Sequence, residues 1–252
     1  MQITVDKKGL ESLLAGLKDF ETPKWQLEQL QTPPDIASIM LLEAFYRGDI
    51  LAKRVADLGC GTGILGLGAA ILGAKEVYCV EIDKDALKIA EENKRMLEAI
   101  IERELPIIFV NSDVRMFFEL VDTVIMNPPF GLERGRRHSD LIFLEKAFEI
   151  AHAVYSLHRK HERSRIFLKK FAEDRGFRAE VLGTFRFPLK AIFPWHRKPK
   201  MIIEVDFYLF RMIDNLYTKA LHQSNQRIQK ADLISNYIHK QNGLLFNSFE
   251  IE

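Results

Sequence analysis

From Arg54 onward the chain alternates short β-rich runs with longer helical stretches, and this alternation limits the fold more than any other feature. It is typical of βαβ units, in which a helix connects each parallel strand to the next and covers the sheet. Strands are predicted at 54–58, 76–81, 107–111, 122–126 and 153–158, and helices at 63–72, 84–103 and 141–151. We therefore expect an α/β fold with a mostly parallel sheet and helices on both faces.

The order of elements changes after a predicted helix at 164–175. Two further strands, at 178–187 and 200–210, follow each other with no helix between them. Consecutive strands of this kind can pair antiparallel at the edge of a sheet. The whole sheet is then expected to have seven strands.

The first fifty residues have a helical pattern instead. Leucines recur at helical spacing in residues 7–19, and Thr32 followed by proline and Asp35 is a typical helix start. The predicted organisation is a helical segment packing on the core at 1–50, an α/β domain at 51–211, and a C-terminal extension, helical in pattern, at 212–252.

Composition supports a globular protein. Of 252 residues, 47% are hydrophobic, and the most apolar stretch, 63–74, is too short to span a bilayer. The two cysteines, Cys60 and Cys79, are too few for a disulfide framework or a four-cysteine zinc site. We expect a cytoplasmic protein with no membrane segment and no metal.

The net charge of +1 hides an uneven distribution. Residues 131–200 hold 17 Lys and Arg against 8 Asp and Glu, whereas the rest of the chain is acidic. Much of the excess lies in three clusters, at 134–138, 158–165 and 195–200. A single cluster is typical of a solvated surface, but three of them with interleaved aromatic residues favour a polyanionic partner.

A glycine-rich turn follows the first predicted strand. Asp57, Gly59, Gly61 and Gly63 stand where the strand passes into a helix, and Glu81 ends the next strand about 20 residues later. Glycines there allow a ligand to lie against bare backbone, and the acidic residue can accept both hydroxyls of a ribose. The turn and the acid together predict a cofactor that contains a nucleoside.

The details of this turn favour S-adenosylmethionine. The third glycine comes one position too early for a dinucleotide fingerprint, and Asp57 would repel a pyrophosphate but attract a sulfonium or ammonium group. Asp113, after the third strand, is placed to accept from the adenine amino group, and Val114 to donate a backbone amide. Asp113 is also a plausible N-cap for a helix at 114–120.

The fourth strand ends in "NPPF". Two prolines make this corner stiff, because proline fixes φ and removes an amide donor. Asn127 then lies at the carboxyl end of the strand, where ligands bind in open parallel sheets. The Asn127 side-chain oxygen and the Pro128 carbonyl can hold both hydrogens of a planar amine, Pro129 stiffens the corner, and Phe130 can stack on the acceptor ring. A plain strand terminator is the alternative.

Together these motifs resemble the class I methyltransferases that act on amino groups of adenine, cytosine or glutamine. More narrowly the chain resembles the methyltransferase-like protein five family, the N6-adenosine methyltransferases of small-subunit ribosomal RNA, and their archaeal relatives. The segments that carry the resemblance are "LEQLQTPPDIA", "DLGCGTGIL", "VIMNPPFG" and "VYSLH". The resemblance implies a Rossmann-like fold and covers roughly residues 7–210.

The resemblance also implies roles for individual residues. Gln29 and Thr32 would close over the cofactor, and Thr62 and Ile64 would line its loop with Gly59. Asn127 to Phe130 would form the acceptor clamp. Family members in eukaryotes work with a small zinc-bearing activator subunit that covers a hydrophobic sheet edge. The expected substrate is structured RNA, with the target adenine unpaired or flipped.

Two other functions remain open from sequence alone. One is N5-methylation of a glutamine in a translation factor, by enzymes whose corner usually ends in tyrosine where this chain has Phe130. The other is a non-catalytic RNA-binding protein that keeps the fold.

Overall fold

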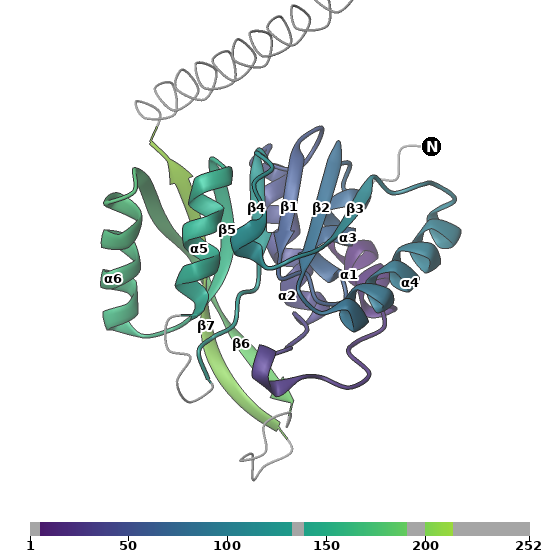
Figure 1. Cartoon of the computed structure of the whole chain (residues 1–252), viewed down its shortest axis with the longest axis horizontal. Coiled ribbons are helices and arrows are strands. Elements are labelled where there is room, and N and C mark those ends of the chain that lie inside the picture. The colour runs from purple at the N-terminus through teal and green to yellow at the C-terminus, as the bar shows by residue number, and fades with distance from the viewer. Residues whose placement is uncertain (1–5, 133–138, 191–199, 214–252) are drawn as a thin grey trace, which may run out of the picture. The chain divides into compact units, whose positions relative to one another are not determined.

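The computed structural model describes residues 6–132, 139–190 and 200–213, and these contain a single seven-stranded sheet in the order β3-β2-β1-β4-β5-β7-β6 (Figure 1). The strands are β1 (Arg54–Leu58), β2 (Glu76–Glu81), β3 (Ile107–Asn111), β4 (Thr123–Met126), β5 (Ala153–Arg159), β6 (Phe177–Lys190) and β7 (Lys200–Met212). Strands β1 to β5 pair in parallel, β7 pairs antiparallel with β5, and β6 forms the edge beyond β7. The predicted mostly parallel, seven-stranded α/β fold is confirmed.

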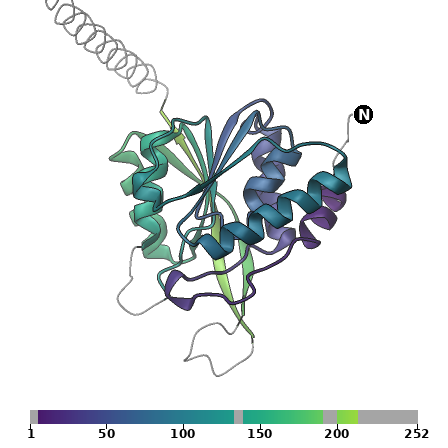
Figure 2. The ribbon, with the colours of Figure 1, turned by 45° about the vertical axis from the view of Figure 1, so that its right-hand side comes forward.

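Helices cover both faces of this sheet. They are α1 (Lys7–Ala15), α2 (Pro34–Tyr46), α3 (Ile64–Ile71), α4 (Lys84–Ile101), α5 (Ser139–Ile150) and α6 (Glu162–Glu173), with short 3-10 turns η1 (Trp25–Leu27) and η2 (Val114–Met116). Figure 2 shows α5 and α6 on one side of the sheet and α1 to α4 on the other. None of the helices in the described ranges combines the length and the apolar composition that crossing a bilayer requires.

The N-terminal helices share one core with the sheet. Leu10 and Leu14 of α1 and Met40 of α2 are fully buried in the same cluster as Val55 of β1 and Val77 of β2. The described residues as far as Arg211 belong to one compact unit. The central strands β1, β4 and β5 are buried at nearly every position because both of their faces are covered.

Three predicted boundaries in the first part of the chain are wrong. Helix α1 ends at Ala15 instead of 19, because Gly16 is its C-cap. Thr32 is not the N-cap of α2; Pro33, with extended backbone, takes that position, and the helix begins at Pro34. The segment expected to be a helix at 114–120 forms only the single turn η2. The predicted helical extension, 212–252, lies outside the described residues except for Met212, which ends strand β7, and Ile213.

The chain between α1 and α2 crosses the side of the sheet where the parallel strands end. This connecting strap, residues 16–33, carries η1 and lies across the carboxyl ends of the strands (Figure 1). Its first part is fixed to α4, because the backbone N–H of Lys18 donates to Asn93 Oδ1 at 2.8 Å and Asn93 Nδ2 donates back to the Lys18 carbonyl at 3.0 Å. The strap therefore covers the carboxyl ends of the strands, where ligands bind in α/β sheets.

Candidate active site

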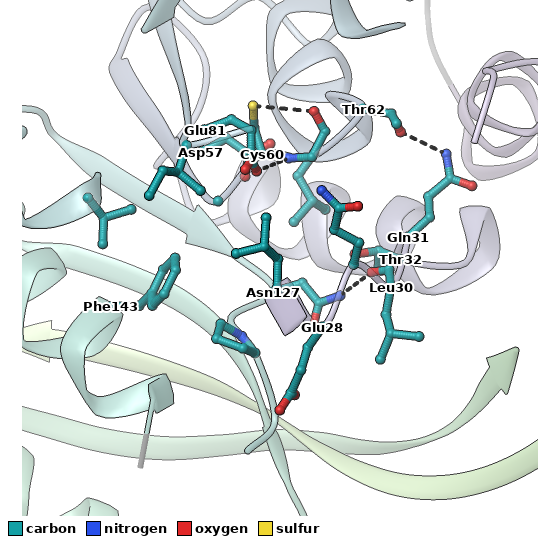
Figure 3. Close-up of a pocket in the computed structure, with 18 of the residues that line it drawn as sticks. Glu28, Leu30, Gln31, Thr32, Asp57, Cys60, Thr62, Glu81, Asn127 and Phe143 are labelled. Carbon is teal, nitrogen blue, oxygen red and sulfur yellow. Dashed lines mark hydrogen bonds between the residues drawn. The ribbon is translucent and has the colours of Figure 1, made fainter. Parts of the chain in front are cut away.

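A cavity of ≈ 530 Å³ lies under the strap. Its walls come from the strap, the turn after β1, the end of β2, the start of η2, the end of β4 and the first turns of α5 (Figure 3). This volume is within the range of sites that enclose a nucleoside-sized ligand. Six separate segments of the chain thus meet at one site.

The turn after β1 presents bare backbone to the cavity. Gly59 and Gly61 have φ values of 71° and 54°, which side-chain-bearing residues rarely adopt. A Cβ atom on Gly59 would lie 2.9 Å from the ring of Phe143, and one on Gly61 would lie 2.6 Å from the ring of Phe20. Only glycine is compatible with both the backbone conformation and the aromatic neighbours here.

Glu81 lines the same cavity from the end of β2. Its two carboxylate oxygens accept from the backbone N–H groups of Gly61 and Asp83, each at 2.9 Å. Burial raises the pKa of Glu81, although these hydrogen bonds oppose the shift. The bonds leave lone pairs free on each oxygen, so the carboxylate can still accept from the two hydroxyls of a ribose.

Asp57 is fully buried beneath the glycine turn. Its Oδ2 accepts from the backbone N–H of Gly66 in α3 at 2.7 Å. Burial raises its pKa to about 7, and the nearby carboxylate of Glu81 adds to the shift. Two acidic groups at one end of the cavity suit a cationic ligand group, which would favour the ionised form of Asp57.

Gln29 anchors the strap to the segment after β2. Its Nε2 donates to Asp83 Oδ2 at 2.7 Å, and Lys24 Nζ donates to the other oxygen of Asp83 at 2.6 Å. Burial works against the charge on Asp83, but these two partners outweigh it and hold its pKa below the usual range. Thr32 is buried and lines the cavity next to this anchor.

Thr62 and Asp113 also line the cavity. Thr62 Oγ1 accepts from Gln31 Nε2 of the strap at 3.2 Å (Figure 3). Asp113 is the N-cap of η2, accepts from the backbone N–H of Arg115 at 2.9 Å, and has a lowered pKa because of the Arg115 guanidinium. It lines the cavity together with Val114, so the capping role and a ligand role are compatible.

Asn127 holds its amide in one orientation. Its Nδ2 donates to the Leu30 carbonyl of the strap at 3.2 Å (Figure 3), while its Oδ1 is buried and has no hydrogen-bond partner within the described residues. An unsatisfied buried oxygen is costly and rare in native proteins. This oxygen belongs to a cavity-lining residue, and it can accept a hydrogen from a ligand.

The rest of the proline corner is divided between the cavity and the core. Pro129 lines the cavity, whereas Pro128 and Phe130 are not among its lining residues. The Phe130 ring packs edge-on against Phe187 of β6, with centroids 5.4 Å apart. Stacking of Phe130 on an acceptor ring therefore stays a prediction.

Most of the residues selected from the sequence meet at this one site. Of those predicted to bind a cofactor, Gly63 is not in the lining; it is the N-cap of α3. The residues that line the cavity as predicted are Gln29, Thr32, Asp57, Gly59, Gly61, Thr62, Ile64, Glu81, Asp113, Val114, Asn127 and Pro129. Their roles in binding and catalysis stay predictions.

Sequence reasoning missed the aromatic and strap contacts. Phe20 and Phe143 touch the glycine turn from segments more than 40 residues away, and the Leu30 carbonyl orients Asn127. Nothing local in the sequence marks these residues, because each depends on a long-range contact. Asp83 had a local signal, since it is the N-cap of α4.

The comparisons with known proteins agree with this geometry. Residues 31–150 match the family model of the methyltransferase small domain. The rRNA N(6)-adenosine-methyltransferase METTL5 of Danio rerio is 42% identical over 81% of this chain and 97% of the relative, and Mettl5 of Drosophila melanogaster is 38% identical over 81% and 95%.

A solved structure supports the same assignment. A candidate RNA methyltransferase of Pyrococcus horikoshii superposes with a TM-score of 0.75 and 42% identity, over 84% of this chain and all of that protein. The identity over nearly the full length of these relatives, together with the shared fold, shows that the chain belongs to the METTL5 family of methyltransferases.

Proposed function

We propose that the protein transfers a methyl group from S-adenosylmethionine to the N6 amine of an adenine in small-subunit ribosomal RNA. The observation that carries this proposal is the buried, unpaired Oδ1 of Asn127 in the same cavity as the glycine turn and Glu81. An amine that is to receive a methyl group must be held in a fixed orientation. A hydrogen-bond acceptor fixed at the carboxyl end of β4 can hold it.

The residues of the cavity fit the cofactor. Bare backbone at Gly59 and Gly61 accepts a flat ligand, the Glu81 carboxylate suits a ribose, and the buried acid Asp57 suits a cationic group. When bound, S-adenosylmethionine supplies an electrophilic methyl group on a sulfonium. Asp113 and Val114, which also line the cavity, are the expected partners of the adenine ring.

The acceptor residues act by orienting the amine. An exocyclic amine is a weak nucleophile because its lone pair is delocalised into the ring. Asn127 Oδ1 and the Pro128 carbonyl would accept its two hydrogens and so direct the lone pair toward the methyl group. No general base is needed before transfer, because the product ammonium is acidic enough to lose its proton to water.

The relatives and the surface support RNA as the substrate. The curated relatives are named as rRNA methyltransferases. Within the described residues, Arg159 and Arg163 are exposed near the start of α6, and neither guanidinium has an ion-pair partner there. Free cationic groups beside the carboxyl end of β5 suit a phosphate backbone. The proposed substrate also supports a cytoplasmic location. The other two basic clusters lie outside the described residues, apart from Lys200.

The proposal predicts a specific loss in cells that lack this protein. Mass spectrometry of nucleosides from small-subunit ribosomal RNA should show one N6-methyladenosine fewer than in unmodified cells. Incubation of the purified protein with labelled S-adenosylmethionine and either RNA or translation factors is the companion experiment. Label in RNA supports the proposal, and label in a glutamine of a protein, or in neither, overturns it.

We also propose that a small zinc-bearing activator subunit covers the β3 edge. Among the described strands β3 stands at one end of the sheet beside β2, and the side chains of Ile108 in β3 and Met116 in η2 are exposed. Isolated sheet edges with exposed apolar groups attract partners. Ile108→Asp should abolish binding of the activator in calorimetry, whereas unchanged affinity would place the activator elsewhere.

Cofactor affinity should depend on pH through Asp57. The pKa of this carboxyl is raised to about 7 by burial, so below pH 7 the free protein binds a proton that must leave before the carboxylate can face a cation. Affinity for S-adenosylmethionine should therefore rise with pH, by up to ~10-fold per pH unit below 7, and level off above it.

Asp57→Asn is the matched control for this pH dependence. Its side-chain oxygen can still accept from the Gly66 N–H, and the ammonium group of the ligand titrates equally with both proteins. Calorimetry from pH 5.5 to 8.5 in two buffers of different ionisation enthalpy would measure the affinity and the protons released. Identical pH profiles for the two proteins would exclude Asp57 as the source.

A further inference from the structure

Three hydrogen-bonded polar side chains, two of them buried, lie beside the active site. Ser156 Oγ and His158 Nε2 are 2.9 Å apart, and His158 Nδ1 and Asp140 Oδ2 are 3.0 Å apart. Ser156 and His158 belong to the "VYSLH" segment of β5 and are 0% and 1% exposed. The proposed transfer reaction uses none of these three residues.

The partners decide which nitrogen of His158 carries a hydrogen. An ionised carboxylate can only accept, so Nδ1 must donate to Asp140. In the neutral imidazole Nε2 is then the acceptor, and the Ser156 hydroxyl donates to it. Each side chain thus satisfies the next, and the chain of hydrogen bonds has one defined direction.

This arrangement resembles a hydrolytic triad but cannot act as one. The rings of Tyr208 and Phe210 in β7 pack edge-on against His158, with centroids 5.5 and 6.0 Å away, and Ser156 has no exposed surface. No substrate can reach the hydroxyl or the ring. Any role of Ser156, His158 and Asp140 must therefore come from the parts of the structure that their hydrogen bonds hold in place.

Asp140 connects the chain to a wall of the cavity. It lies in the first turn of α5, whose first two turns contribute Ser139, Ile142 and Phe143 to the cavity lining. The Phe143 ring also lies against the glycine turn at Gly59, where it occupies the space of a Cβ atom. A shift of this turn would move one wall of the active site.

His158 lies on the strand next to the acceptor corner. Met126 at the end of β4 pairs with Ser156 of β5, so Asn127 follows directly on the strand beside the chain. The hydrogen bonds from Ser156 to Asp140 thus tie the start of α5 to the strand pair that carries Asn127. The first turns of α5 and the end of β4, which both line the cavity, are therefore linked by these hydrogen bonds.

We propose that His158 is a positioning residue for methyl transfer, which holds the first turn of α5 through Asp140 and so keeps Phe143 in register with the glycine turn and with Asn127. This role rests on the proposed function of the site. It explains why the "VYSLH" segment has Ser156 and His158 at buried positions, where unpaired polar groups would destabilise the fold.

The test compares Asp140→Ala with Asp140→Asn in the full chain. Asp140 is partly exposed at a helix start, so both variants should fold. Alanine should lower kcat/KM for RNA methylation roughly 10- to 100-fold, because small displacements in an active site cost rate. Asp140→Asn should restore most of the rate, since its oxygen can accept from His158 Nδ1. The affinity of Asp140→Asn for S-adenosylmethionine should stay near that of the unchanged protein.

A double-mutant cycle tests whether the two residues act together. His158→Ala should show the same loss of rate, and the double variant should be no worse than either single variant. Hydrogen exchange of the amides of residues 143–146, which bond to the first-turn carbonyls, should be faster in Asp140→Ala. A rate for folded Asp140→Ala equal to that of the unchanged protein, or single effects that multiply, would overturn the proposal.

Tyr155→Phe is the control for general destabilisation. It removes a buried hydrogen bond to Asp49, 2.6 Å long, from the same strand β5 but with no link to α5. This variant should unfold at a lower temperature and still methylate at a normal rate when folded. The hydrogen-exchange measurement does not depend on the reaction, so it tests whether His158 and Asp140 hold the first turn of α5 in any case. If the unchanged protein fails to methylate RNA, that result counts against the proposed function alone.

Discussion

Asn127→Ala is expected to bind S-adenosylmethionine but to lose methyl transfer by on the order of 10²-fold or more. The substitution removes a buried acceptor of a cavity-lining residue, the Oδ1 that has no hydrogen-bond partner within the described residues. It also removes the bond to the Leu30 carbonyl, but the strap keeps its anchors at Asp83 and Thr62, so the cofactor site should remain. Single-turnover rates and calorimetry on the same preparation measure the two properties separately.

Asn127→Asp separates orientation from hydrogen-bond acceptance. An aspartate can accept a hydrogen from the amine, but it cannot donate to the Leu30 carbonyl and would face it with a negative charge. We expect this variant to be nearly as slow as the alanine variant. Turnover close to normal in Asn127→Ala would show that Asn127 Oδ1 is not needed to accept a hydrogen from the amine, whatever the result for Asn127→Asp.

Glu81→Ala should weaken cofactor binding strongly. Hydrogen bonds to a charged acceptor contribute about 1.5–3 kcal/mol each, so loss of two bonds to a ribose should weaken affinity by on the order of 10²-fold or more. The glycine turn would suffer as well, because the Gly61 N–H loses its acceptor at 2.9 Å. The shift in melting temperature on adding S-adenosylhomocysteine measures this loss.

Asp85→Ala is the matched control for Glu81. Asp85 lies four residues further on, is exposed, and contacts Lys24 at 3.1 Å without lining the cavity. Its loss should change ligand affinity little, because exposed ion pairs contribute little. If Glu81→Ala and Asp85→Ala bind the ligand equally well, the ribose role of Glu81 is wrong.

The strands could be predicted from sequence because their signals are local. The predicted limits of β1, β2 and β3 coincide with those observed, since each strand is a short apolar run bounded by turn residues or by helical periodicity. The limits of α2 were harder to predict. Thr32 has the pattern of an N-cap, but the burial of its side chain at the cavity wall competes with capping, and Pro33 takes the cap position instead.

Chemistry that depends on the ends of parallel strands was also predictable. The turn after β1, Glu81 after β2 and Asn127 after β4 come together because parallel strands in one sheet end on the same side. Residue type and position along the chain were sufficient for this inference. The placement of Phe130 was not predictable, because its ring packs against Phe187, which lies 57 residues further along the chain.

The sequence by itself determined the α/β class, the strand order in the chain and the residue types at the strand ends, because these follow from local periodicity and turn chemistry. Only the tertiary structure decided which side chains meet: Phe20 and Phe143 at the glycine turn, Leu30 at Asn127, and Asp140 at His158. Such contacts join segments far apart in the chain and depend on packing and on the pairing of buried polar groups, for which no local pattern exists.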